Sequence, residues 1–262
     1  MITKKTPEEI EILKEAGGIL GRMLRELAAA LKPGMTTLDV DDLAMELVEK
    51  YQVEPVLLGY HPTFADTPYP AAICVSVNDC VQHGVPSEDV ILKEGDTVNL
   101  DMSIAHKGLI VDSGITVGVG EISSEVKKLL AATEEALALG IKQAVAGNHI
   151  GDISHAIQTL IESRGFSVVE VLCGHGVGYA VHEEPTIPNF GRAGTGPLIE
   201  VGHVYAIEPI VNMGSADVFF DDDGDGYSVY TEDESWSAHF EHTVAITKAG
   251  PVILTKPSKY KL

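Results

Sequence analysis

The spacing of apolar residues separates four helical segments from the rest of the chain. In each segment apolar side chains recur every three or four positions, with charged residues between them. The first begins at residues 6–9, TPEE, which match a helix N-terminus with a capping box, and it stops before the proline and glycine at positions 33 and 34. The predicted helices cover residues 6–32, 36–51, 123–147 and 152–165.

Short or alternating apolar runs predict strands in the remaining segments. Residues 96–120 have the pattern of two strands around a turn at residues 106–108, and residues 59–72 have the prolines of a loop. Further strands are predicted at residues 73–77, 167–172, 203–211, 227–231, 238–247 and 251–255. Helices and hairpins mix without regular alternation, which predicts an α+β fold. Because no repeat or linker interrupts the pattern, we expect one domain, residues 1–262.

The predicted hairpin at residues 96–120 contains two aspartates whose side chains could lie close together. If His106 and Lys107 form a two-residue turn, Asp101 lies directly opposite Asp112, with Cβ atoms roughly 5 Å apart. Two carboxylates at this distance repel each other unless a proton or a cation lies between them. A three-residue turn would shift the register by one, and solvated surface aspartates are the alternative interpretation.

Two glutamates and one histidine occupy unusual positions further along the chain. Glu208 and Glu241 have apolar neighbours within predicted strands, and a buried glutamate is costly unless it is paired or binds a metal. Strand alternation also allows both side chains to face water. Pro209 predicts a sheet edge or a strand end beside Glu208. His175 lies between two glycines, which lets the backbone bend freely and aim its ring.

These side chains together form a candidate metal site with one imidazole and four carboxylates. Such an oxygen-rich set suits a pair of Mn, Fe, Co or Zn ions better than a thiolate zinc site would. Four carboxylates also carry enough negative charge to balance two divalent ions. The candidate ligands are Asp101, Asp112, His175, Glu208 and Glu241.

Composition narrows the classes of partner and compartment. Acidic residues outnumber basic residues 39 to 18, for a formal net charge of −21, which argues against direct binding of nucleic acid. No apolar run approaches the roughly 18 residues of a membrane span, so we expect no membrane partner. The three cysteines form no CxxC pair and leave one unpaired, which favours a reducing compartment. We therefore expect a cytoplasmic protein.

Several longer motifs resemble those of one metallopeptidase family. The stretches NDCVQHGVP, GDTVNLDMSI, VDSG, CGHGVGYAVHEEP, YAIEPIVNMG and SAHFEHTVAIT occur in the order and spacing of the type I methionine aminopeptidases. The similarity covers nearly the whole chain and matches the short bacterial form, because no long insertion separates His175 from Glu208. It implies the pita-bread fold, a central antiparallel sheet with helices packed on its outer face.

The resemblance assigns the candidate ligands to two metal ions. It implies that Asp101 binds one ion, that His175 and Glu208 bind the other, and that Asp112 and Glu241 bridge the two. The cofactors would be two divalent ions per chain, drawn from Co, Mn, Fe and Zn.

The resemblance also implies an activity and three catalytic residues. Glu208 would act as the base, His182 would face the scissile carbonyl, and His83 would lie near the substrate amine. The enzyme would remove the N-terminal methionine from peptides and nascent polypeptides that have a small second residue. We expect a monomer, with nascent chains and the ribosome as partners.

The substrate pocket is the part in which this chain departs most from the family. The resemblance places four substrate-binding side chains in addition to His83: Tyr60, Tyr69, Cys74 and Tyr227. Three pocket positions differ from the usual residues: Leu57, Val181 and Tyr227. Val111 stands where the family has a glycine, and the loop before Tyr69 is longer than usual, so the strictness for methionine is open.

One rival motif matches a calcium-binding loop. Residues 221–232, DDDGDGYSVYTE, have every residue type of that pattern in place. The segments around it read as strands, whereas helices flank a calcium loop of this kind. An acidic hairpin turn explains the stretch better, and calcium stays open as an addition to the enzyme.

Two further alternatives share the expected fold. A non-catalytic pita-bread protein that binds other proteins is expected to have lost ligands, yet all five are present here. A proline-specific aminopeptidase or prolidase usually carries another N-terminal domain, whereas this chain has one pair of helices before its first predicted strand.

Overall fold

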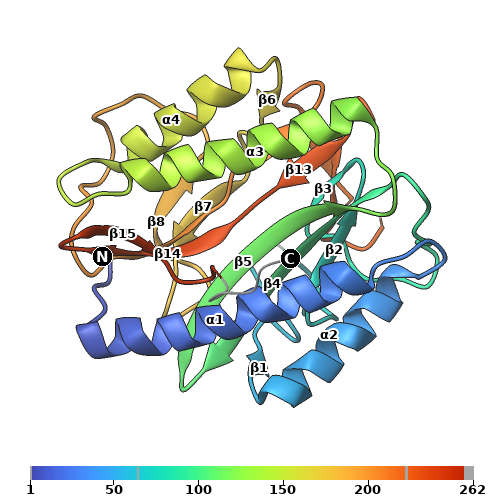
Figure 1. Cartoon of the computed structure of the whole chain (residues 1–262), viewed down its shortest axis with the longest axis horizontal. Helices are drawn as coiled ribbons and strands as arrows, with labels where there is room; N and C mark the ends of the chain where they lie inside the picture. Colours follow the sequence, from blue (N-terminus) through green and yellow to red (C-terminus); the bar gives the residue numbers. More distant parts are fainter. Residues whose placement is uncertain (1, 64, 222–223, 257–262) are drawn as a thin grey trace.

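The structure is a computed structural model, and it describes residues 2–63, 65–221 and 224–256. In this part of the chain, helices lie in front of a set of antiparallel strands (Figure 1). The helices are α1 (Pro7–Ala30), α2 (Thr37–Tyr51), α3 (Ser124–Gln143) and α4 (Ile150–Ser163). All four were predicted, with ends that differ from the prediction by up to four residues.

The predicted start of α1 is confirmed in its hydrogen bonds. The Thr6 hydroxyl accepts from the Glu9 amide at 3.2 Å, and the Glu9 carboxylate accepts from the Thr6 amide at 2.7 Å. Thr36 and Asp39 repeat this capping box at the start of α2. Each box satisfies two backbone donors that the helix leaves unpaired.

The strands are short, apart from the long hairpin formed by β4 and β5. In the described residues they are β1 (Glu54–Pro55), β2 (Cys74–Val77), β3 (Cys80–Gln82), β4 (Thr97–His106), β5 (Leu109–Gly118), β6 (Ser167–Val168), β7 (Cys173–Gly176), β8 (Glu183–Pro188), β9 (Val204–Ile207), β10 (Ile210–Asn212), β11 (Val218–Phe220), β12 (Val229–Thr231), β13 (Ser237–His239), β14 (His242–Thr247) and β15 (Gly250–Ile253).

All the strand pairs are antiparallel. One sheet holds β4 with β1, β2 and β5, and a five-stranded sheet has the order β15-β14-β9-β7-β8. Two three-stranded sheets have the orders β13-β10-β6 and β11-β12-β3. The prediction missed β1, β3, β7 and β8 and extended the run at 167–172 beyond β6. The α+β class and the pita-bread arrangement are confirmed.

The predicted pairing of the hairpin is wrong by two residues, because the turn lies one residue later in the chain than predicted. The turn consists of Lys107 and Gly108, with φ angles of 52° and 79°, so His106 pairs with Leu109. Positive φ at both central residues is what a tight hairpin turn requires, and glycine provides it at the second position. Asp112 therefore pairs with Ser103, two residues from Asp101. The two aspartates still share one face of the sheet, as diagonal neighbours.

Two predicted strands are interrupted at their glutamates. The run at 203–211 divides into β9 and β10 at Glu208-Pro209, and the run at 238–247 divides into β13 and β14 at Phe240-Glu241. At these breaks the chain crosses between the two sheets: β9 belongs to the five-stranded sheet and β10 to the sheet of β6, β10 and β13, whereas β13 belongs to the latter sheet and β14 to the five-stranded one. The same register holds on both sides of the interruption, which places Glu208 opposite Glu241.

Two apolar clusters hold the strands in place from the helical side. One lies between α1, α2 and the β4–β5 hairpin, and the other joins α3 and α4 to strands that include β9, β10 and β14. Val111 is fully buried in the first cluster, so its side chain supports the hairpin under α1. No helix in the described ranges has both the length and the apolar character to cross a membrane.

Adjacent glycines in α1 provide a matched test of how closely this helix packs. A Cβ atom at Gly17 would lie 2.5 Å from the Leu254 carbonyl oxygen, whereas at Gly18 the nearest atom is an Arg22 side-chain nitrogen at 3.8 Å. We expect Gly17→Ala to lower the free energy of unfolding by roughly 1–3 kcal/mol through overpacking. Gly18→Ala should raise it by about 0.5–1 kcal/mol, because alanine favours the helix. Urea denaturation of both variants checks this, and equal effects would contradict the packing of α1 on residue 254.

Candidate metal centre

A cavity of about 550 Å³ contains all five predicted ligands. Its acidic residues come from different parts of the fold: Asp101 from β4, Asp112 from β5, Glu208 from the end of β9 and Glu241 from the start of β14. His175 enters from β7. Each of the five side chains is buried, so the alternative that these acids face water is wrong.

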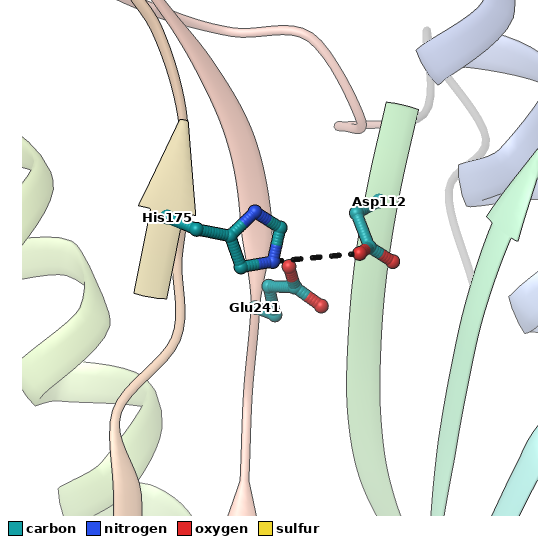
Figure 2. Close-up of side chains that lie close together, drawn as sticks. All are labelled: Asp112, His175 and Glu241. Atoms are coloured by element: carbon teal, nitrogen blue, oxygen red, sulfur yellow. Dashed lines mark ion pairs between the residues drawn. The ribbon is translucent and has the colours of Figure 1, made fainter. Parts of the chain in front are cut away.

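Asp112, His175 and Glu241 form the tightest group in the cavity. Their side chains point toward one another from β5, from β7 and from the residue just before β14 (Figure 2), with potential ligand atoms within 4.8 Å of one another. The His175 Nε2 atom lies 3.7 Å from Asp112 Oδ2 and 3.5 Å from Glu208 Oε1. These separations leave space between the donor atoms for an ion.

Hydrogen bonds orient these groups toward that space. His175 Nδ1 lies 2.9 Å from the Gly176 carbonyl oxygen. The carbonyl can only accept, so Nδ1 carries the proton and Nε2 presents its lone pair to the carboxylates. Asp112 Oδ1 and Glu241 Oε1 are buried without a hydrogen-bond partner among the described residues. Hard anionic oxygens and a bare imidazole nitrogen fit a divalent cation.

Burial and mutual repulsion make the ionised acids costly in the absence of a cation. Burial raises the pKa of Asp101 and Glu208 well above the usual values, and the charges of neighbouring acids raise it further. Glu241 shifts in the same direction for the same reasons, and burial also raises the pKa of Asp112. Burial lowers the pKa of His175 to about 4, so this ligand is neutral near pH 7.

Two residues that lie beside Glu208 were not identified as candidate site residues from the sequence. Gln82 Nε2 donates to Glu208 Oε2 at 3.2 Å, and His239 Nε2 lies 3.8 Å from the same oxygen. Glu208 Oε1 stays directed at His175. In the sequence, Gln82 is a polar residue next to His83, and His239 lies two positions before Glu241. Only the fold shows that both side chains face Glu208.

The two predicted auxiliary histidines line the same cavity. His182 Nδ1 lies 2.9 Å from the Tyr60 hydroxyl, and its ring packs edge-on against that of His175. His83 is half-buried with a φ of 59°, and its Nδ1 atom is buried without a hydrogen-bond partner among the described residues. Burial and the charge of a neighbouring histidine lower the pKa of both His83 and His182 to about 4.

The predicted substrate-binding residues form the apolar end of this cavity. Besides His83, its lining includes Tyr60, Tyr69, Cys74 and Tyr227, together with Leu57 and Val181. Tyr69 and Tyr227 pack edge to face with ring centres 5.0 Å apart. Tyr69 therefore lies in the pocket despite the long loop before it, and one cavity joins an acidic end to an aromatic end.

The calcium-loop pattern adjoins strands and no helix among the described residues, in agreement with the sequence. Strand β11 ends directly before the pattern, and strand β12 lies within its second half. Asp225 uses both of its oxygens within the turn, accepting from the amides of Tyr227 and Ser228 and from the Ser228 hydroxyl. Asp223 lies outside the described residues. In the residues that are described, the pattern has the hydrogen bonding of an acidic hairpin turn.

Comparison with known proteins agrees with the fold and the site. Residues 11–248 match metallopeptidase family M24. The chain therefore belongs to the M24 metallopeptidases. It is 45% identical over 252 residues to a methionine aminopeptidase of Aquifex aeolicus, with 95% of this chain and 96% of the relative covered. This similarity confirms the resemblance to methionine aminopeptidases.

Solved structures give the same result. A methionine aminopeptidase from Thermotoga maritima superimposes with a TM-score of 0.93 at 43% identity, covering 98% of this chain and 100% of that chain. A prolidase from Pyrococcus horikoshii superimposes with a TM-score of 0.74 at 21% identity, and 64% of that chain is covered. The prolidase shares the fold, whereas the similarity to the methionine aminopeptidase extends to sequence over the full length.

The raised carboxyl pKa values predict how metal stabilisation depends on pH. A carboxyl group with a raised folded pKa favours folding at low pH, and this contribution is lost as the pH rises through that pKa. Metal binding displaces the same protons. We therefore expect the increase in melting temperature on adding Mn²⁺ to be larger at about pH 8 than at about pH 6.5, measured by calorimetry on the metal-free protein.

Two variants control this measurement. Glu241→Gln removes one buried charge, so it should raise the melting temperature of the metal-free protein at the higher pH and remove most of the Mn²⁺ effect. Glu134→Gln, at an exposed position on α3, should behave like the wild type. An Mn²⁺ effect of equal size at both pH values would contradict the displacement of protons from these acids.

Proposed function

We propose that this chain is a methionine aminopeptidase that uses two divalent metal ions, drawn from Co, Mn, Fe and Zn. It would remove the N-terminal methionine from peptides and nascent proteins with a small second residue. The observation that carries the proposal is the single cavity in which five buried ligand-type side chains adjoin an aromatic pocket. The identity to methionine aminopeptidases over nearly the full length supports the same activity.

The donor set divides between two ions in this proposal. Asp101 would hold one ion, His175 and Glu208 would hold the other, and Asp112 and Glu241 would bridge them. The unpartnered oxygens of Asp112 and Glu241 support the bridging role. Bound ions would supply a water of lowered pKa at neutral pH and would polarise the peptide carbonyl.

Glu208 has the properties of a general base in this site. Burial and neighbouring charges raise its pKa in the metal-free protein, the proton held there would be displaced when ions bind, and the ionised carboxylate could then accept a proton near neutrality. Gln82 holds Oε2 while Oε1 faces His175. In the proposed reaction Glu208 takes the proton of the attacking water and returns it to the leaving nitrogen.

His182 would stabilise the oxyanion as a neutral donor. Its pKa of about 4 keeps the ring neutral near pH 7. When the Tyr60 hydroxyl donates to Nδ1, the ring proton lies on Nε2, where it can donate to the developing negative charge. His83, on the wall of the same cavity, would contact the free amine of the substrate.

The pocket and the compartment complete the proposal. Tyr69, Tyr227 and Cys74 offer a buried aromatic and sulfur lining that suits an unbranched thioether side chain. We further propose one catalytic domain over residues 1–262, acting as a monomer in the cytoplasm on nascent chains, with the ribosome as a partner. The three free cysteines support a reducing compartment. The net charge of −21 argues against direct binding of nucleic acid.

Peptide hydrolysis tests the proposed activity. We expect the purified protein with Mn²⁺ or Co²⁺ to release methionine from Met-Gly-Ser and Met-Ala-Ser, and to leave X-Pro peptides intact. Removing the metal with a chelator should abolish turnover, because the hydroxide source is lost. Turnover of X-Pro peptides without turnover of Met-Gly-Ser would assign the chain to the proline-specific alternative, and turnover of neither would favour the non-catalytic one.

Replacing His182 separates transition-state stabilisation from metal binding. His182→Ala should lower kcat by about 10² to 10³-fold, because one oxyanion donor is removed. The affinity for Mn²⁺, measured by calorimetry, should stay within a factor of two. A loss of bound metal would instead make His182 a ligand and would contradict the assigned division between the two histidines.

A further inference from the structure

The segment between β7 and β8 carries two residues of the cavity, and it packs against the N-terminal residues of the chain. Val181 and His182 lie in this segment, called the His182 loop here (residues 177–182), and both line the cavity. The N-terminal residues are bound nearby through the backbone, where the Lys5 amide donates to the Gly202 carbonyl at 2.8 Å. The two segments are more than 170 residues apart in sequence.

Glu183 closes the His182 loop on itself. Its Oε1 atom accepts from the Tyr179 amide at 2.5 Å and from the Ala180 amide at 3.2 Å. Its Oε2 atom accepts from the Lys5 ammonium at 2.7 Å and from the Thr3 hydroxyl. Burial raises the pKa of Glu183, but these hydrogen bonds outweigh it and leave the pKa lowered, so the side chain is ionised. The residue after His182 is thus fixed from both sides.

Lys5 is enclosed by the loop that it contacts. The side chains of Lys5 and Glu183 are 1% and 7% exposed, so water screens this pair very little. The Lys5 ammonium also lies 4.9 Å from the centre of the Tyr179 ring. At Gly178, with φ of 141°, a Cβ atom would come within 2.3 Å of Lys5 Cε, so the lysine stem fits only against a glycine there.

The neighbouring lysine shows a different environment. Lys4 pairs with Glu200 at 2.8 Å, but these side chains are 52% and 49% exposed. Exposed pairs contribute little to stability, whereas removing one partner of a buried pair leaves an uncompensated charge. Two adjacent residues of the same type thus form a buried pair under the His182 loop and a solvated pair outside it.

We propose that Lys5 and Glu183 are positioning residues that hold the His182 loop so that the His182 ring faces the reacting carbonyl. The proposal rests on the proposed function, in which His182 contacts the substrate. Lys5 does not line the cavity, so it acts through the loop alone. A displacement of about 1 Å in a catalytic group is enough to slow an enzyme by tenfold or more.

Kinetics of four variants on Met-Gly-Ser test this role. With saturating Mn²⁺, Lys5→Met should lower kcat by on the order of tenfold with little change in KM. Lys4→Met is the matched control and should stay within a factor of two. In the His182→Ala background, adding Lys5→Met should cause no further loss, because the lysine acts through that histidine. Equal losses in both backgrounds would overturn the proposal.

A measurement without turnover separates this proposal from the proposed function. Hydrogen exchange of the metal-free protein should be faster in residues 177–183 for Lys5→Met than for Lys4→Met, since the Tyr179 and Ala180 amides lose a fixed acceptor. Glu183→Gln keeps the size of the side chain and should show the same increase if Lys5→Met fails to fold. Unchanged exchange in both buried-pair variants would overturn the proposal, even if the wild type proves inactive on methionyl peptides.

Discussion

The repulsion among four buried carboxyl groups is the constraint on which the site depends. Asp101, Asp112, Glu208 and Glu241 lie in one cavity, and their raised pKa values express the cost of ionising them together. The strands that bear them cannot move apart, because two apolar clusters fix them against the helices. Packing of the core therefore holds like charges close together. A bound divalent cation lowers the electrostatic cost of ionising these acids.

The two ends of the cavity differ in the chemical character of their side chains. The acidic end concentrates negative charge, and the aromatic end is lined by Tyr69 and Tyr227, whose rings pack edge to face. His182 stands between them, held by Tyr60 through its ring and by Glu183 through its loop. A molecule that fills the aromatic end would thus extend toward the candidate metal ligands and the histidine. Binding and reaction depend on one continuous surface.

Local features were predictable from the sequence, and long-range pairing was not. The capping box at Thr6 and the four helices follow from local residue types and apolar period. Glu208 and Glu241 could be singled out because a glutamate within an apolar run is costly to bury, and His175 because of its flanking glycines. Asp101 and Asp112 were singled out through a pairing that proved wrong, yet they still share one face of the sheet. The hairpin register failed because it depends on the turn geometry at Lys107. Gln82 and the Lys5–Glu183 pair were missed because their partners lie more than 100 residues away, and His239 was missed because its approach to Glu208 depends on how β10 and β13 pair.

The continuous register through Glu208 and Glu241 has a consequence for how the chain can vary in length. Successive side chains of a strand alternate between faces, so one residue inserted or deleted in either run would turn its glutamate away from the cavity. These two runs are therefore closed to single-residue length changes. In the described part of the loop at residues 59–72 no acid lines the cavity, so this loop can lengthen with far less penalty. Because Tyr60 and Tyr69 come from this loop, such a change would alter the shape of the aromatic end and leave the acidic end in place.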